Sequence, residues 1–102
     1  MYGLIVKLIV VPGQREEVIT VLKESTRDMP GCLSYVIAKD PADENAIWVT
    51  EVWDSVASHD SSLSLASVRD AITKVKPRMS NFERIAVTTP VGGVGLPSEK
   101  LP

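Results

Sequence analysis

The histidine at position 59, the only one in the chain, is the side chain best suited to move a proton near neutral pH. It follows Trp53 by six residues, close to the expected start of a helix, from which it could face a pocket. A base placed there can deprotonate a phenol or a quinol, and the resulting electron-rich anion can pass an electron to O₂ without a metal or a flavin. The alternative is a solvent-exposed or capping histidine, and the sequence leaves both interpretations open.

A carboxylate, Glu51, shares one face of a predicted strand with apolar side chains and with Trp53. Burial in an apolar pocket would raise its pKa, so Glu51 could act as a base or orient His59. The alternative is an ion pair with Arg84 or Lys7 on a neighbouring strand. Structural ion pairs perturb carboxylates as readily as active sites do, and the sequence alone favours this second interpretation.

Aromatic side chains are few, and they fall on different faces of the predicted sheet. Trp48 and Trp53 project to opposite faces of one strand, so they cannot both line one pocket. One of them is expected in the core or between two sheets, and the other could stack on an aromatic ligand. The same choice between core and ligand applies to Tyr35 and Phe82, and the phenol of Tyr35 adds a hydrogen-bonding group.

Composition excludes several function classes. The net charge of −2 and the lack of a basic run argue against a nucleic-acid partner. The longest apolar stretch, residues 4–11, contains Lys7, is too short to span a membrane and lacks the features of a signal peptide, so we expect a cytoplasmic protein without a membrane partner. The single Cys32 is expected to be a small buried hydrophobe. One His, one Cys and scattered carboxylates lack the spacing of metal ligands, so no metal site is predicted. The glycines at 92–95 precede no helix, so they are not expected to form a phosphate loop.

The elements that must position these residues follow from periodicity and turn signals. The sequence predicts the following segments: a strand Tyr2–Val11, a helix Gln14–Asp28, strands Cys32–Ala38 and Ala46–Trp53, a helical region from Asp54 or Ser55 to Pro77 with a break near Ser64–Ser67, and a strand Phe82–Thr89. Residues 90–102, rich in Gly and Pro, are predicted to form an extended or disordered arm after one domain at 1–89.

This order, β-α-β-β-α-β, predicts an α+β, ferredoxin-like fold in which one four-stranded antiparallel sheet carries both helices on a single face. The other face would be bare, although the predicted strands are apolar on both sides. The simplest cover is the sheet of a second copy related by two-fold symmetry. A homodimer is therefore expected, and the small size of the chain adds to that expectation.

Three segments, residues 30–35, 51–55 and 57–63, resemble in order and spacing the antibiotic biosynthesis monooxygenase family of the dimeric α/β-barrel superfamily. The likeness covers about residues 2–89. It implies two sheets packed into a barrel and a pocket between sheet and helices in each protomer. The implied activity is a cofactor-independent oxygenation of a quinol or small electron-rich aromatic, with no bound cofactor, and the alternative is a non-catalytic binding or accessory dimer.

On this resemblance the candidate catalytic residues are His59 and Glu51, and the candidate substrate contacts are Trp53, Tyr35, Ser62 and Phe82. The chain also departs from the family's patterns. Haem-degrading members use Asn, Trp and His where this chain is expected to have Val6, Ser62 and Ile72, which argues against haem chemistry. Members that oxidise polyketides use Asn and Trp around positions 58 and 62, where both residues here are serine, and this favours the accessory alternative.

Overall fold

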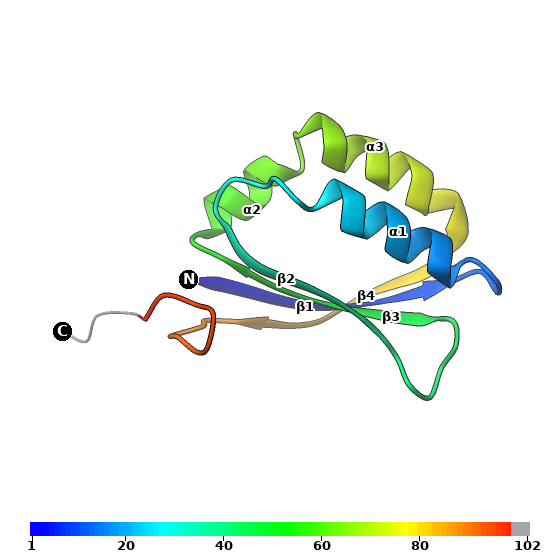
Figure 1. Ribbon diagram of the computed structural model, residues 1–102, viewed down its shortest axis with the longest axis horizontal. Helices are drawn as coiled ribbons and strands as arrows, with labels where there is room; N and C mark the ends of the chain where they lie inside the picture. The colour runs from blue at the N-terminus through cyan, green and yellow to red at the C-terminus, as the bar shows by residue number, and fades with distance from the viewer. Residues whose placement is uncertain (99–102) are drawn as a thin grey trace.

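A single four-stranded antiparallel sheet with helices on one face forms the molecule, as the computed structural model shows for residues 1–98 (Figure 1). The elements are β1 (Tyr2–Val10), α1 (Arg15–Ser25), β2 (Cys32–Lys39), β3 (Ala46–Trp53), α2 (Val56–Ser62), α3 (Ala66–Val75), the 3₁₀ turn η1 (Lys76–Arg78) and β4 (Met79–Thr88). The strand order is β2-β3-β1-β4. The ferredoxin-like α+β prediction is confirmed.

The first helix is shorter than predicted, since α1 ends at Ser25 and not at Asp28. The N–H of Thr26 and its hydroxyl both donate to the carbonyl oxygen of Leu22, at 3.2 and 2.7 Å. A threonine side chain that takes up a carbonyl of the last turn competes with continuation of the helix. The helix therefore ends six residues before Gly31.

The second helical region is split, as predicted, into α2 and α3. The hydroxyl of Ser55 accepts the N–H of Ser58 at 3.1 Å and so caps the start of α2. The break falls at residues 63–65, one residue earlier than expected, where three successive N–H groups turn back to carbonyls three residues before them. This break lets α2 and α3 lie over different parts of the sheet.

The last strand begins at Met79, three residues before the predicted start at Phe82. The helical region was predicted to stop at Pro77, whereas α3 ends at Val75 and Pro77 lies inside the turn η1, which leads directly into β4. The carbonyl of Arg78 then accepts the N–H of Val11, and its guanidinium donates to Gln14 Oε1 at 3.1 Å. These bonds fix the start of the edge strand beside the end of β1.

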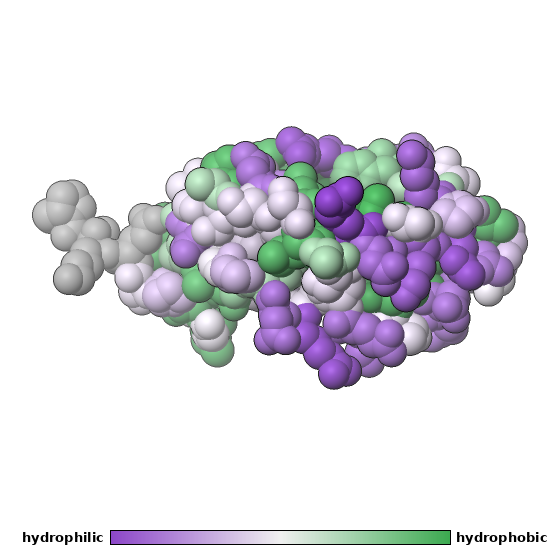
Figure 2. Space-filling view, turned by 90° about the horizontal axis from the view of Figure 1, so that it is seen from above, coloured by the Kyte–Doolittle hydropathy of each residue, from purple (hydrophilic) through white to green (hydrophobic). Residues whose placement is uncertain are grey.

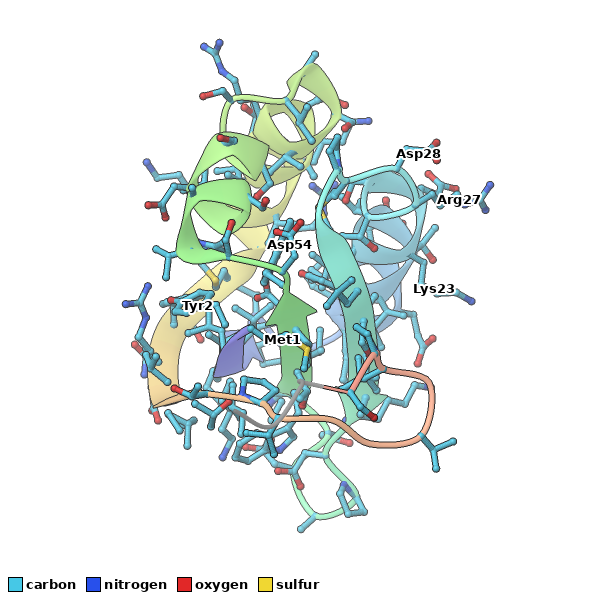
Figure 3. The ribbon with its side chains drawn as sticks, turned by 90° about the vertical axis from the view of Figure 1, so that its left-hand side faces the viewer. Met1, Tyr2, Lys23, Arg27, Asp28 and Asp54 are labelled. Carbon is cyan, nitrogen blue, oxygen red and sulfur yellow. The ribbon has the colours of Figure 1, made fainter. Side chains whose placement is uncertain are left out.

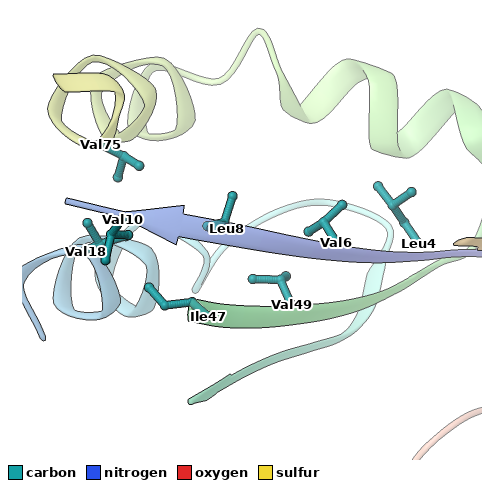
Figure 4. Close-up of a cluster of buried hydrophobic side chains, with 8 residues drawn as sticks. All are labelled: Leu4, Val6, Leu8, Val10, Val18, Ile47, Val49 and Val75. Carbon is teal, nitrogen blue, oxygen red and sulfur yellow. The ribbon is translucent and has the colours of Figure 1, made fainter. Parts of the chain in front are cut away.

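The core lies between the sheet and the helices and is built by alternation along β1 and β3. Every second residue of these strands points to the helices, where Val18 of α1 and Val75 of α3 meet them (Figure 4). The buried strand members of this cluster are Leu4, Val6, Leu8, Val10, Ile47 and Val49. Complete burial of such a side chain contributes about 1.5–3 kcal/mol, so this seam is the main source of stability.

The opposite face of the sheet carries the alternate residues, and no helix of residues 1–98 covers it (Figure 1). Lys7 and Trp48 lie opposite each other on β1 and β3, with the ammonium 5.2 Å from the centre of the indole ring. The indole N–H of Trp48 donates to Asp40 Oδ2 at 2.9 Å. Trp48 and Trp53 therefore lie on opposite faces, as the strand pattern predicts.

After β4 the chain continues along the end of the sheet. A Cβ added to Gly3 would lie 2.0 Å from Thr88 Oγ1 and 2.9 Å from Pro90 Cγ, so β1 and the start of this segment pack closely. Val94 is fully exposed, next to a turn closed by the Leu96 N–H and the Gly93 carbonyl. The rest of the predicted arm, residues 99–102, lies outside the described residues. Within residues 1–98 no helix combines the length and the apolar character needed to cross a membrane.

Candidate functional site

A cavity of about 520 Å³ lies between the sheet and the helices. Its walls come from all four strands and from the three α-helices. All six side chains that the sequence put forward for catalysis or substrate contact line it, namely Tyr35, Glu51, Trp53, His59, Ser62 and Phe82. Most of the remaining lining is apolar, and it includes Leu4, Val6, Leu8, Leu22, Met29, Val49, Val68, Ala71, Val75 and Met79. Such a cavity fits a small, largely apolar ligand.

Glu51 is the one carboxylate among the lining residues, and only 8% of it is exposed. Burial raises the pKa of its carboxyl, whereas a hydrogen bond from Trp53 and the nearby His59 and Arg84 oppose that rise. The bond runs from Trp53 Nε1 to Glu51 Oε1 at 3.0 Å. A carboxylate kept at a raised pKa inside an apolar cavity is suited to take up a proton.

The alternative of an ion pair for Glu51 does not match the geometry. Within residues 1–98 no Lys or Arg nitrogen lies within 4.0 Å of its carboxylate oxygens. Lys7 lies on the other face of the sheet, over Trp48. Arg84 lines the cavity and acts on Glu51 electrostatically from a greater distance.

His59 packs against two aromatic rings at the end of the cavity where Glu51 lies. Its ring centre lies 5.4 Å from that of Tyr2 and 5.5 Å from that of Trp53, edge to face with the latter at 83°. Its Nδ1 is 3.0 Å from Asp60 Oδ1, and only 13% of the imidazole side chain is exposed. With Nδ1 engaged, Nε2 is the nitrogen left for a ligand. Asp60 was missed from the sequence, although its place directly after His59 was a usable signal.

The phenol of Tyr35 lies across the β2–β3 ladder from Glu51. Burial, reinforced by the negative charge of Glu51, raises the pKa of Tyr35 well above its usual value. The phenol therefore keeps its proton and is a hydrogen-bond donor at all pH values of interest. Together Tyr35, Glu51 and His59 place donors and acceptors at one end of the cavity.

Three hydroxyl groups that line the cavity are not free donors. Ser25 and Thr26 both donate to the carbonyl of Leu22, at 3.3 and 2.7 Å. Ser62, predicted as a substrate contact, donates to the carbonyl of His59 at 2.6 Å. The hydroxyl of Ser62 can thus only accept a hydrogen bond from a ligand, and it helps to hold the helical turn that carries His59.

The polar end of the cavity is closed by the approach of the β2 start to α2. Gly31 has φ +81°, and a Cβ added there would lie 2.4 Å from Ser58 Oγ and 2.7 Å from Asp54 Oδ1. Tyr2 and Asp54 lie at this same end of the sheet (Figure 3). Only glycine allows both the backbone conformation and the close approach.

Cys32 lies beside the site without lining it. Its thiol is half-buried, contacts the carbonyl of Ser34 at 3.6 Å, and has a pKa raised by burial and by Glu51. A thiol in this state is a poor nucleophile. In the part of the chain that the structure describes, no three His, Cys, Asp or Glu side chains are grouped so that they could share a metal ion.

Comparison with known proteins identifies the architecture. The family model described as antibiotic biosynthesis monooxygenase matches residues 1–74. The chain belongs to this family. It is 54% identical to a proposed antibiotic biosynthesis monooxygenase from Chloroflexus aurantiacus J-10-fl, with a TM-score of 0.87 over 90% of this chain and 94% of the other.

More distant members of the antibiotic biosynthesis monooxygenase family share the fold alone. A proposed member from Deinococcus radiodurans is 23% identical, with a TM-score of 0.73 over 91% of this chain and 93% of that one. Another from Bacteriodes thetaiotaomicron VPI-5482 is 20% identical, with a TM-score of 0.79 over 99% and 95%. No curated protein sequence matches the chain significantly.

Proposed function

We propose that the protein is a cofactor-independent monooxygenase that oxidises a quinol or a small electron-rich aromatic with O₂ in this cavity. The observation that carries the proposal is the buried Glu51, whose raised pKa, beside His59 and inside an apolar cavity, suits a general base. Family membership supports the same reaction class.

In the proposed reaction Glu51 or His59 accepts a proton from a substrate hydroxyl. The phenolate transfers one electron to O₂, and the two radicals combine to form a C–O bond at a ring carbon. The carbon that carries the peroxide then loses its proton, and the electrons of that C–H bond form a C=O bond as the O–O bond breaks. The departing oxygen leaves as water with this proton and the stored one. One quinol and one O₂ give one hydroxyquinone and one water, and all electrons that reduce O₂ come from the quinol.

The other side chains would define the shape of the site and exclude water from it. Trp53, almost fully buried, holds Glu51 Oε1 and leaves Oε2 for the substrate hydroxyl. Tyr35 would donate to a substrate oxygen, and Phe82 would contact the ring from β4. An apolar surrounding strengthens each of these polar contacts because little water competes with them.

We also propose that two copies associate through the bare sheet face. This face presents apolar side chains from β1 and β3, including the partly buried Ile5, Ile9 and Val52, with Val36 of β2 half-exposed beside them. Sheet-on-sheet packing would bury them. Thr50→Arg, at an exposed position on this face, should shift sedimentation from twice the 11.1 kDa chain mass to once that mass, while Thr20→Arg on α1 should not. A wild-type monomer at micromolar concentration would refute the dimer.

Oxygen uptake with a menadiol-like quinol in metal-free, flavin-free buffer tests the catalytic proposal. We expect enzyme-dependent uptake above autoxidation, reduced about 10²–10⁴-fold by Glu51→Gln or His59→Ala. Glu44→Gln, an exposed glutamate in the β2–β3 turn, is the matched control and should leave the rate unchanged. Uptake that is equal in wild type and both site variants would contradict the proposal.

The second candidate function is a binding or accessory dimer without turnover. Ser58 and Ser62 favour it, since the resemblance leads one to expect Asn and Trp around these positions in polyketide-oxidising relatives. Thermal stabilisation by menadiol-like or polyphenol compounds without any enzyme-dependent oxygen uptake would distinguish it from the enzyme.

A further inference from the structure

The polar and apolar residues that line the cavity are separated along the length of β1. Glu51 pairs with Leu4 at one level of the sheet, Arg84 with Val6, and Phe82 with Leu8. The rise of a strand puts the first and last of these levels about 13 Å apart. Tyr35 and His59 lie with Glu51 at the first level, Arg84 lines the cavity at the middle level, and Leu8 and Phe82 make the last level apolar.

At the far end of the cavity, beyond Leu8 and Phe82, the apolar wall is followed by a positively charged side chain. Val75 and Met79 line this end, and Lys76 lies between them in the chain and lines the cavity too. Lys76 is exposed and forms no ion pair with any acid of residues 1–98. It is at the C-terminus of α3, where a cation is favourable in any case, so a control at the same helix end is needed.

The opening of the cavity lies between the helices α2 and α3 and the edge strand β4. Three apolar lining residues are half-exposed there, namely Leu63, Ile72 and Phe82 at 49–52%. Apolar surface of this kind is visible among polar side chains on the helix side of the molecule (Figure 2). A water-filled opening would not favour such a rim, whereas an apolar ligand would cover it.

Charge is distributed unevenly, and the positive part surrounds this opening. Residues 66–88, which form α3, η1 and β4, carry five Lys or Arg and two Asp or Glu, whereas the chain as a whole has a net charge of −2. A positive region on an acidic protein attracts anions to that side. Arg84, exposed and lining the cavity, adds to the field at the opening.

We propose that the substrate is an elongated anion, with its reacting hydroxyl at Glu51 and a carboxylate or similar anionic group at Lys76. Its rigid aromatic body fills the apolar middle of the cavity. This inference rests on the proposed function, since it extends the same site. It predicts a preference for anionic aromatics over neutral ones of equal shape.

Equilibrium binding tests this with three probes: 6-hydroxy-2-naphthoic acid, its methyl ester and 2-naphthol. We expect the acid to bind about two- to fivefold tighter than the ester, because a partly exposed charge pair contributes only modestly to binding. The preference should shrink at high salt and fall sharply in Lys76→Met, where only the weaker field of Arg84 remains. Lys76→Arg should restore it, and Lys74→Met, which removes a lysine already paired with Asp70 at 3.0 Å, should retain it.

The possible failures are distinguishable. Equal or tighter binding of the ester, or an unchanged preference in Lys76→Met, overturns the anionic-substrate inference and leaves the proposed oxygenation standing. Failure of all three probes to bind overturns the aromatic cavity itself, and with it both proposals. Folding of each variant is checked by its thermal unfolding before binding is measured.

Discussion

Trp53 Nε1 donates a 3.0 Å hydrogen bond to Oε1 of Glu51, two residues earlier on the same face of β3. The tryptophan on the opposite face of β3, Trp48, donates in the same way to Asp40 Oδ2 at 2.9 Å. Each tryptophan thus stabilises one carboxylate, but only Glu51 is buried in the cavity. The two tryptophans of β3 and their carboxylate partners can therefore be compared directly.

Trp53→Phe should raise the pKa of Glu51 further, because a hydrogen bond to the carboxylate favours the ionised form and the substitution removes it. Carboxyl ¹³C shifts followed against pH measure this directly. Trp48→Phe is the control, and it should raise the pKa of Asp40 while leaving Glu51 unchanged. A Glu51 titration that is the same in wild type and Trp53→Phe would show that the indole does not hold the carboxylate.

The free energy of unfolding of Glu51→Gln should exceed that of wild type increasingly as pH rises. Because the folded-state pKa of Glu51 is raised, both states are protonated at low pH, and wild type loses stability as pH climbs through the folded pKa. Urea unfolding from pH 2 to pH 8 measures the difference.

Glu16→Gln provides the opposite case for the same urea experiment. The pKa of Glu16 is lowered by its hydrogen bond with Lys39, so its contribution is present above the unfolded-state pKa and is lost as pH falls. This variant should be less stable than wild type at neutral pH and equal to it in acid. If the two variants showed the same pH trend, the contrast between a buried and a paired glutamate would be wrong.

Alternation along β1 and β3 made the sheet predictable, because every inward side chain except Glu51 is apolar or aromatic and the register follows from this pattern. The ends of the helices and strands were harder to predict from the sequence. Thr26 ends α1 through a local bond of its own hydroxyl to the carbonyl of Leu22, which helix periodicity does not reveal. Pro77 lies within a 3₁₀ turn that leads into β4, and neither the turn nor the start of the strand has a clear signal in the pattern of side chains.

The site residues were predictable because inward positions of β3 and the first turn of α2 meet at one end of the fold. The hydrogen-bond and contact partners of these residues were not predictable. The bond from Trp53 to Glu51, the contact of Asp60 with His59 and the use of the Ser62 hydroxyl within its own helix depend on side-chain rotamers. The place of Lys76 in the cavity wall depends on where α3 stops.

Arg15→Met should lower the free energy of unfolding by about 1–3 kcal/mol without changing ligand binding. One guanidinium nitrogen of Arg15 contacts the carbonyls of Asp40, Asp43 and Ala46 at 3.0–3.3 Å, so it holds the β2–β3 turn to the start of α1. Urea unfolding measures the loss. Lys23→Met, an exposed cation on the same helix, should change stability little, and an equal loss there would argue against the clamp.

Gly31→Ala should cost about 3 kcal/mol or more, because it adds a steric clash with Ser58 to the cost of a positive φ. Gly13→Ala isolates the backbone part, since φ is +85° there and a Cβ would meet nothing within 4 Å. We expect about 1–2 kcal/mol for that control. Thermal unfolding compares the two, and equal losses would mean that the approach of β2 to α2 can relax freely.

The most direct test of the proposed reaction is mass spectrometry of the product formed from a quinol under ¹⁸O₂ in metal-free, flavin-free buffer. Base-driven monooxygenation in the Glu51 cavity predicts a hydroxyquinone that carries one ¹⁸O atom, formed by wild type and strongly reduced in Glu51→Gln. A product without ¹⁸O, or a simple quinone formed at equal rates by both proteins, would contradict it.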